Sequence, residues 1–141
     1  MRRREFRSGF EKTIRKQLDE QKVKYKYEPC KIKWKRRVSS GECGRCGHSK
    51  VYQLCSYTPD FVLGNGIWIE AKGKLDSRNR TKLKAIREQH PEIDLRLVFQ
   101  RDNIIKGTKN KTRYSEWASK LGFRFAIGSV PSAWLGDGGG D

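Results

Sequence analysis

The sequence predicts an α/β fold in which helices flank a mixed β-sheet. Residues 57–72 are typical of a β-hairpin, because two runs rich in β-forming residues enclose the turn Gly64-Asn65-Gly66. The apolar segment 95–99 closely follows a predicted helix at about 78–90, which favours a parallel crossover onto one hairpin strand. Antiparallel and parallel pairing in one sheet make it mixed. A chain of 141 residues suits a single domain.

The first predicted helix runs from about Ser8 to Gln21. An apolar stripe recurs at a spacing of four residues, and Glu11 follows Ser8 by three, which is the pattern of a capping box. The local pattern therefore assigns Glu11 to helix capping. Arg15, on the polar face, is a candidate for contacts with DNA phosphates.

The next segment, 24–34, alternates large apolar and polar residues and predicts an extended strand, in which Pro29 favours an edge position or a break. Towards the end of the chain we expect a short helix at 114–121 and a strand at 123–126. The Gly/Asp-rich tail at 136–141 has no residues that could pack, so we expect it to be disordered and the domain to cover residues 1–135.

The predicted helix at 78–90 ends before Pro91 and is strongly basic at its start. Cations are unusual at a helix N-terminus, where the helix dipole disfavours them. We therefore interpret Arg78, Arg80 and Lys82 as charges kept for an anionic ligand, namely DNA.

The chain is highly basic, with 32 Lys and Arg residues against 16 Asp and Glu residues and a formal net charge of +16. Such a charge concentrates polyanions, and nucleic acid is the expected partner. A membrane surface is disfavoured, because no segment combines a basic face with a long apolar one. The sequence also lacks an apolar segment typical of a secretory signal or a membrane span, so we expect a cytoplasmic protein.

The hairpin carries the chemistry. If its loop is 64–66, Asp60 lies opposite Glu70, and two like charges across a strand pair repel each other unless a cation lies between them. Mg²⁺, which prefers oxygen ligands, is the natural candidate. Lys72 projects from the same face as Glu70. Two carboxylates and an ammonium group at one end of a hairpin predict a metal-dependent site that cleaves phosphodiesters.

The cysteines predict a structural zinc site within an insertion at about residues 30–55. Cys43 and Cys46 form a short turn with glycines, the arrangement with which two thiolates bind one ion, and two further thiols flank it. Disulfides are disfavoured in a cytoplasmic chain. His48 could replace either Cys30 or Cys55. The preferred zinc ligands are Cys30, Cys43, Cys46 and Cys55.

Several segments together resemble a known family. They are Phe6–Glu11, Tyr57–Phe61, Gly64–Ile67, Glu70–Gly73 and Ile86–Glu92. In this order they are similar to the bacteriophage endonuclease I family, which are Holliday junction resolvases with a PD-(D/E)xK nuclease core. The similarity runs from about Phe6 to Trp134, and it implies a restriction-endonuclease-like fold.

The resemblance implies an active site made of Glu11, Asp60, Glu70 and Lys72. Asp60 and Glu70, with the main-chain carbonyl of Ala71, would bind one Mg²⁺ or Mn²⁺ ion, and Glu11 and Asp60 would help to bind a second. Lys72 would orient or help to deprotonate the attacking water. The carboxylate of Glu11 is then expected to point at metal instead of serving only as a cap.

The resemblance also implies a domain-swapped homodimer, in which each active site takes its first-helix Glu from one chain and its other residues from the partner. A phage-encoded member would act in the host cytoplasm. This chain departs from the family in the segment that leads to the hairpin, which is expanded by the cysteine-bearing stretch of about 37–55.

The expected function is resolution of four-way and branched DNA by paired nicks. One alternative is a restriction-like or transposon-end DNA endonuclease with the same core. A different kind of alternative is a zinc-containing module that binds nucleic acid without catalysis.

Overall fold

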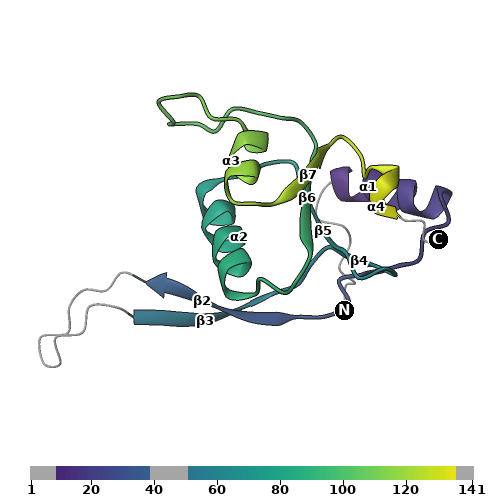
Figure 1. The fold of residues 1–141 in the computed structure, drawn as a ribbon, viewed down its shortest axis with the longest axis horizontal. Coiled ribbons are helices and arrows are strands. Elements are labelled where there is room, and N and C mark those ends of the chain that lie inside the picture. The colour runs from purple at the N-terminus through teal and green to yellow at the C-terminus, as the bar shows by residue number, and fades with distance from the viewer. Residues whose placement is uncertain (1–8, 39–50, 136–141) are drawn as a thin grey trace, which may run out of the picture.

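The computed structural model describes residues 9–38 and 51–135 (Figure 1). In chain order its elements are α1 (Gly9–Glu20), β1 (Tyr25–Tyr27), β2 (Ile32–Val38), β3 (Val51–Tyr57), β4 (Phe61–Leu63), β5 (Trp68–Lys72), α2 (Ser77–Gln89), β6 (Leu95–Phe99), α3 (Tyr114–Lys120), β7 (Arg124–Ile127) and α4 (Ser132–Leu135).

The main sheet has five strands in the order β1-β4-β5-β6-β7. The pairs β1–β4 and β4–β5 are antiparallel, whereas β5–β6 and β6–β7 are parallel. Helix α2 makes the crossover between β5 and β6. The predicted mixed sheet flanked by helices is therefore confirmed.

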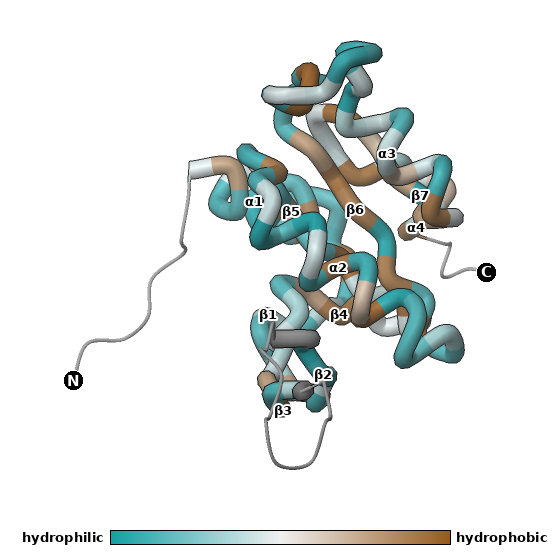
Figure 2. The backbone as a smooth tube through the Cα atoms, turned by 90° about the vertical axis from the view of Figure 1, so that its left-hand side faces the viewer, coloured by the Kyte–Doolittle hydropathy of each residue, from teal (hydrophilic) through white to brown (hydrophobic). Residues whose placement is uncertain are grey.

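Helices cover both faces of this sheet and create two hydrophobic clusters (Figure 1). The alternation of side chains along β6 explains why both are needed. Leu95, Leu97 and Phe99 belong to the cluster that contains residues of α2 and α3, and Val98 belongs to the cluster that contains residues of α1 and α4. All five residues of β6 are buried, and the strand is largely brown in Figure 2.

The segment predicted as one strand at 24–34 is divided into two. Strand β1 joins the edge of the main sheet, whereas β2 leaves it and pairs with β3 in a separate two-stranded sheet. Pro29, which lacks an amide hydrogen, lies between the two strands, so the break that it predicted is confirmed.

Strands β2 and β3 form an arm that extends away from the main sheet (Figure 1). They pair without interruption from Ile32 opposite Tyr57 to Val38 opposite Val51. Near the core, Trp34 and Tyr57 are buried. Further out, Tyr52 and Leu54 are 52% and 63% exposed.

Side chains at the end of α2 hold this arm through hydrogen bonds to the main chain of β2. The N–H of Lys35 donates to Oε1 of Gln89 at 2.8 Å, and Nε2 of Gln89 donates to the carbonyl of Lys35 at 2.9 Å. Nε2 of His90 lies 2.7 Å from the carbonyl of Lys33 and must donate, because a carbonyl only accepts. Gln89 thus satisfies β2 much as a neighbouring strand would. Gln89 and His90, which together form a clamp on β2, belong to the segment 87–92 (Arg-Glu-Gln-His-Pro-Glu), for which the sequence alone suggested no catalytic role.

Replacing Gln89 by alanine should loosen the arm locally. The substitution removes both bonds to Lys35, each with a net value of about 0.5–1.5 kcal/mol. Hydrogen exchange at the Lys35 amide should therefore accelerate by about tenfold, while amides in β6 keep their protection. Glu88→Ala, an exposed change at the adjacent position, is the control. Unchanged exchange at Lys35 in the Gln89 variant would show that the clamp contributes nothing.

The first strand of the predicted hairpin begins at Phe61, because Tyr57 belongs to β3, and the helices and the last strand differ from the predictions by at most one residue at either end. Ser8 lies outside the described residues, so its capping role stays a prediction, as does the disorder of 136–141. Helix α2 begins at Ser77 because Asp76 caps it, accepting a hydrogen bond from the N–H of Asn79. Within residues 9–38 and 51–135, no helix is long and apolar enough to span a membrane.

Candidate active site

The hairpin register places two acidic residues across from each other. Val62 pairs with Trp68 and Phe61 with Ile69, so continuing outward sets Asp60 opposite Glu70, as predicted. Both side chains are buried: Asp60 is 3% exposed and Glu70 is 4% exposed. Carboxylates are rarely buried unless they are paired or hydrogen-bonded, so the groups that surround these two decide what the site can do.

A third carboxylate comes from the other end of the sequence. Helix α1 packs against β5, and Glu11 in its first turn is 4% exposed and acts electrostatically on Asp60. In this single chain α1 packs on the hairpin of the same polypeptide, and domain swapping stays a prediction.

Each of the three carboxylates accepts a hydrogen bond from the surrounding fold. Oη of Tyr57 donates to Oε1 of Glu70 at 2.5 Å, and Oη of Tyr27 donates to Oε1 of Glu11 at 3.2 Å. The N–H of Ala71 donates to Oδ2 of Asp60 at 2.8 Å. These bonds set the orientation of the carboxylates.

Sequence reasoning missed both tyrosines as site residues. Burial and the neighbouring Glu70 hold the pKa of Tyr57 well above its usual range, so its hydroxyl remains a hydrogen-bond donor at any working pH. Burial and Glu11 likewise raise the pKa of Tyr27. The sequence signals for Tyr57 were its position three residues before Asp60 and its place in the segment 57–61 that carries the family resemblance, and neither reveals where its ring points.

Lys72 completes the cluster. Its Nζ lies 3.1 Å from Oε2 of Glu70 and donates to Oδ1 of Asn79 at 3.2 Å. Asn79 belongs to the first turn of α2, so the start of this helix helps to fix the ammonium group beside the carboxylates. The amide of Asn79 was not singled out from the sequence.

The electrostatics of the cluster are dominated by Asp60. Burial, followed by the charges of Glu70 and Glu11, raises the pKa of Asp60 to about 9, although the Ala71 N–H and Lys72 act in the opposite direction. In the absence of a cation Asp60 therefore keeps its proton at neutral pH. The site contains more negative charge than the fold alone can stabilise.

This donor set fits a hard divalent cation, because Mg²⁺ and Mn²⁺ prefer carboxylate, carbonyl and water oxygens. Among the residues that the structure describes, no three acidic, histidine or cysteine side chains form a group able to hold one ion. The family-based expectation does not require such a group. It assigns two carboxylates to each ion, Asp60 with Glu70 and Asp60 with Glu11, with the Ala71 carbonyl as a further ligand of the first ion.

Tyr57→Phe should lower catalysis without unfolding the protein. It removes one hydroxyl while the ring stays packed against Trp68, with ring centroids 6.5 Å apart. With its donor gone, Glu70 can rotate, and we expect the cleavage rate at saturating metal to fall about tenfold and the half-saturating metal concentration to rise. Cleavage measured across a metal titration tests this. Tyr52→Phe, at an exposed tyrosine of the same strand, should change neither quantity.

The four basic residues predicted to bind DNA lie in different surroundings. Arg15 is exposed on α1, with Nε 3.8 Å from Asp19, and Arg78 is exposed on α2. Nη1 of Arg80 donates to the carbonyl of Leu75 at 2.8 Å. Nζ of Lys82 lies 5.3 Å from the centre of the Tyr57 ring, which places it next to the carboxylate cluster.

Three of the five candidate zinc ligands, Cys43, Cys46 and His48, lie outside the described residues. Cys30 is an exposed free thiol, and Cys55 is a partly buried free thiol on β3. Zinc binding therefore stays a prediction.

The arm bears on the choice of zinc ligands. Cys30 precedes β2, whose six residue steps span about 20 Å, whereas Cys43 follows the far end of that strand by five residues. Because Cys43, Cys46 and His48 lie outside the described residues, the choice between Cys30 and His48 as the fourth ligand stays open.

Comparison with known proteins decides the relationship. A family model described as phage endonuclease I matches residues 1–139. The chain belongs to the phage endonuclease I family. It is 39% identical over 132 residues to Endonuclease I of Escherichia phage T7, which covers 92% of this chain and 78% of that protein. It is 42% identical over 132 residues to Endodeoxyribonuclease 1 of Enterobacteria phage T3, covering 92% of this chain and 76% of that protein.

Membership of the phage endonuclease I family agrees with the resemblance drawn from the sequence. The matched residues include α1, the hairpin and the end of α2, so the relationship covers Glu11, Asp60, Glu70 and Lys72 together. The names of both relatives describe nucleases.

Proposed function

We propose that this protein is a Mg²⁺-dependent DNA endonuclease, with Mn²⁺ as a possible substitute, that resolves four-way and branched DNA by paired nicks. The observation that carries the proposal is the cluster of three buried carboxylates beside Lys72, in which Asp60 has a pKa of about 9. Such a cluster is costly to the free fold and suited to binding cations. Phage nucleases among the relatives and the charge of +16 support DNA as the substrate.

In this proposal Glu11, Asp60, Glu70 and the carbonyl of Ala71 hold the metal. A bound divalent ion would supply Lewis acidity towards the attacking water and the phosphate oxygens. Tyr57 and Tyr27 keep two of the carboxylates oriented. Lys72, held by Asn79, would orient the attacking water with its ammonium group, and its positive charge would stabilise the pentavalent transition state. Only as a neutral amine would Lys72 instead accept the proton of the water.

Paired nicks require two active sites, which a homodimer would provide. Two-fold symmetry suits a junction that has two equivalent strands to cut. We include the domain-swapped arrangement in the proposal, with the arm as the segment through which the chains would exchange α1. Light scattering of the protein, with and without junction DNA, tests the dimer.

The test of function compares an immobile four-way junction with a linear duplex of the same sequence, with and without Mg²⁺. The Glu70→Gln variant is the inactive control. Symmetric paired nicks near the junction centre, dependent on Mg²⁺ and lost in the variant, support the proposal. Equal cutting of the linear duplex would favour a restriction-like or transposon-end nuclease. Binding without cutting at any Mg²⁺ concentration would favour a non-catalytic module.

We also propose that the segment around the arm binds a structural zinc ion. The support is the Cys43-x-x-Cys46 spacing with Cys55 on the adjoining strand. Metal analysis should find one zinc per chain, lost in Cys43→Ser, and Cys30→Ser should separate the two ligand sets. If Cys43→Ser leaves zinc content, dimerisation and junction cleavage unchanged, the zinc proposal is wrong.

A further inference from the structure

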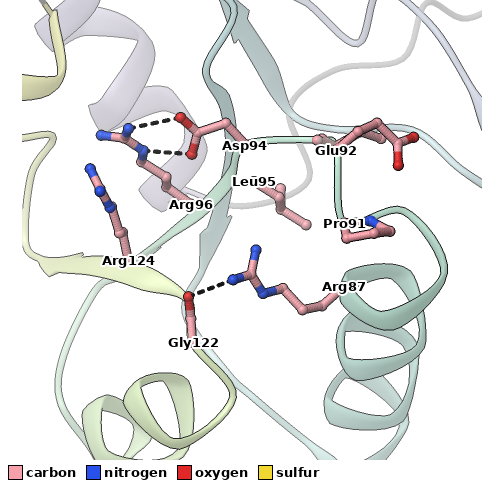
Figure 3. Close-up of a pocket in the computed structure, with 9 residues that line it drawn as sticks. Arg87, Pro91, Glu92, Asp94, Leu95, Arg96, Gly122 and Arg124 are labelled. Carbon is pink, nitrogen blue, oxygen red and sulfur yellow. Dashed lines mark hydrogen bonds and ion pairs between the residues drawn. The ribbon is translucent and has the colours of Figure 1, made fainter.

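A second polar site lies at the opposite edge of the sheet from Lys72. It is a pocket of about 280 Å³ at the beginning of β6 and β7 (Figure 3). Leu95, which lines it, pairs with Trp68, whereas Glu70 pairs with Leu97. Asp94 precedes Leu97 by three residues, so the pocket begins roughly 10 Å from the carboxylate cluster along the strand. Its notable feature is the arginines Arg87, Arg96 and Arg124.

Two of these guanidinium groups are fixed by the fold. Arg87 donates from Nη2 to the carbonyl of Gly122 at 3.0 Å, and its guanidinium lies 5.6 Å from the centre of the Phe123 ring. Arg96 donates from Nε and Nη2 to the carboxylate of Asp94, at 2.9 and 2.8 Å. Arginines that are already fixed lose little conformational entropy on binding a ligand, and among the described residues the Nη1 of neither one makes a hydrogen bond.

Arg96 and Arg124 sit at directly paired positions on neighbouring parallel strands. Like charges at paired positions repel, and each needs a counter-charge. Asp94 provides one for Arg96, whose hydrogen bonds are the largest cause that lowers the pKa of Asp94. Within residues 9–38 and 51–135, the side chain of Arg124 has no hydrogen bond or ion pair of its own, although its charge also helps to lower the pKa of Asp94.

The remaining acid of the pocket does not balance Arg124. The side chain of Glu92 is 69% exposed, points away from the arginines in Figure 3, and lies 3.4 Å from Nδ1 of His90. The pocket therefore contains three cations against one inward carboxylate. An anion with several oxygens matches these donors, and a tetrahedral phosphate is small enough to enter.

We propose that this pocket binds a backbone phosphate of the DNA outside the catalytic centre. The inference rests on the proposed function for its ligand. A separation of roughly 10 Å corresponds to about three base-pair steps of DNA, so a strand that passes the carboxylates has phosphates within reach of the arginines. The contact would be independent of sequence and would fix the direction of one DNA arm.

The test measures how the binding affinity for DNA depends on Arg124 and on individual DNA phosphates. Arg124→Ala is preferred, because Arg87 and Arg96 also hold the fold together. Binding to the junction is measured without divalent metal, in the wild-type protein and in the Glu70→Gln background, as a function of salt. The expected result is a five- to tenfold loss of affinity and a salt slope that falls by about one unit. Lys120→Ala, an exposed change on α3 outside the pocket, should leave the slope unaltered.

A set of junctions, each with one phosphate replaced by neutral methylphosphonate, then locates the contact. One replacement a few base pairs from the cleavage position should weaken wild-type binding five- to tenfold and Arg124→Ala binding not at all. Arg124→Lys should restore part of the affinity, because it keeps the charge but loses the planar donor group.

The proposal would be overturned if the affinity losses caused by Arg124→Ala and by neutral methylphosphonate were additive at every phosphate. It would also be overturned if Lys120→Ala lost as much affinity for the junction as Arg124→Ala. Displacement by inorganic phosphate without coupling to any DNA phosphate would also overturn it, since it would show only an adventitious anion site. These measurements report binding and not cleavage. If the protein bound the junction without cutting it, the proposed function would be refuted, while the binding measurements would still decide whether the pocket holds a DNA phosphate.

Discussion

Asp60→Asn should abolish cleavage and at the same time stabilise the metal-free protein. The substitution removes a carboxylate assigned to both metal ions, so we expect junction cleavage to fall by about 10³-fold or more. Without metal, asparagine accepts the Ala71 hydrogen bond as aspartate does, but it does not have to take up a proton when the protein folds at neutral pH. The free energy of unfolding at neutral pH should rise by on the order of 1–3 kcal/mol.

The pH dependence of this gain has a definite sign. The pKa of Asp60 rises from 3.8 to about 9 on folding, so between these values the folded state binds more protons than the unfolded state. The stability of the wild-type protein attributable to Asp60 is complete below about pH 4 and is lost as the pH rises towards 9. The advantage of Asp60→Asn should therefore be small at pH 5 and largest near pH 9.

Thermal unfolding in EDTA at pH 5, 7 and 9, together with junction cleavage in Mg²⁺, measures both effects. A stabilisation of 1–3 kcal/mol corresponds to a rise in Tm of about 3–10 °C for a domain of this size. Glu88→Gln, at an exposed position of α2, should shift Tm little and equally at each pH. A less stable Asp60→Asn protein at pH 9 would mean that the carboxylate supports the free fold.

Metal binding should release a proton, with a large effect on affinity. Asp60 must ionise to act as a ligand, so below pH 9 the divalent ion competes with the Asp60 proton. We expect the apparent affinity for Mg²⁺ to rise by close to tenfold per pH unit between about pH 6 and 8, and then to level off near pH 9.

Calorimetric titrations in two buffers of different ionisation enthalpy count the protons released. About one proton per active site should leave at pH 7, and fewer than half as many at pH 9.5. Asp60→Asn should bind Mg²⁺ weakly and release none. If the wild-type heat does not depend on the buffer, then Asp60 is already ionised in the free protein.

The hairpin was predictable from sequence because its determinants are local. Gly64-Asn65-Gly66 sets the turn, Gly66 adopts a φ of 93° that favours glycine, and a fixed turn sets every pair outward to Asp60 and Glu70. The parallel crossover was equally accessible, because a helix directly between two strands leaves few other topologies.

The remainder depends on contacts between distant segments. Glu11 fitted a capping pattern, and only the family resemblance pointed to metal, because the position of α1 over β5 is a property of the folded core. Tyr57 reaches Glu70 from the arm, whose pairing of Ile32 with Tyr57 joins residues 25 positions apart. The pKa of Asp60 follows from burial and two neighbouring charges, none of which a spacing reveals.

The way in which α2 holds the arm leaves the chemistry of the arm open to variation. Gln89 and His90 form their hydrogen bonds with the main chain of Lys33 and Lys35. Every amino acid except proline offers both an N–H and a carbonyl, so these hydrogen bonds tolerate almost any residue at positions 33 and 35, although not at the buried Trp34 between them. Mutation of the exposed Lys33 and Lys35 can thus change the charge of the arm without removing the hydrogen bonds that hold it to α2. The charge of the arm and its attachment are therefore free to evolve separately.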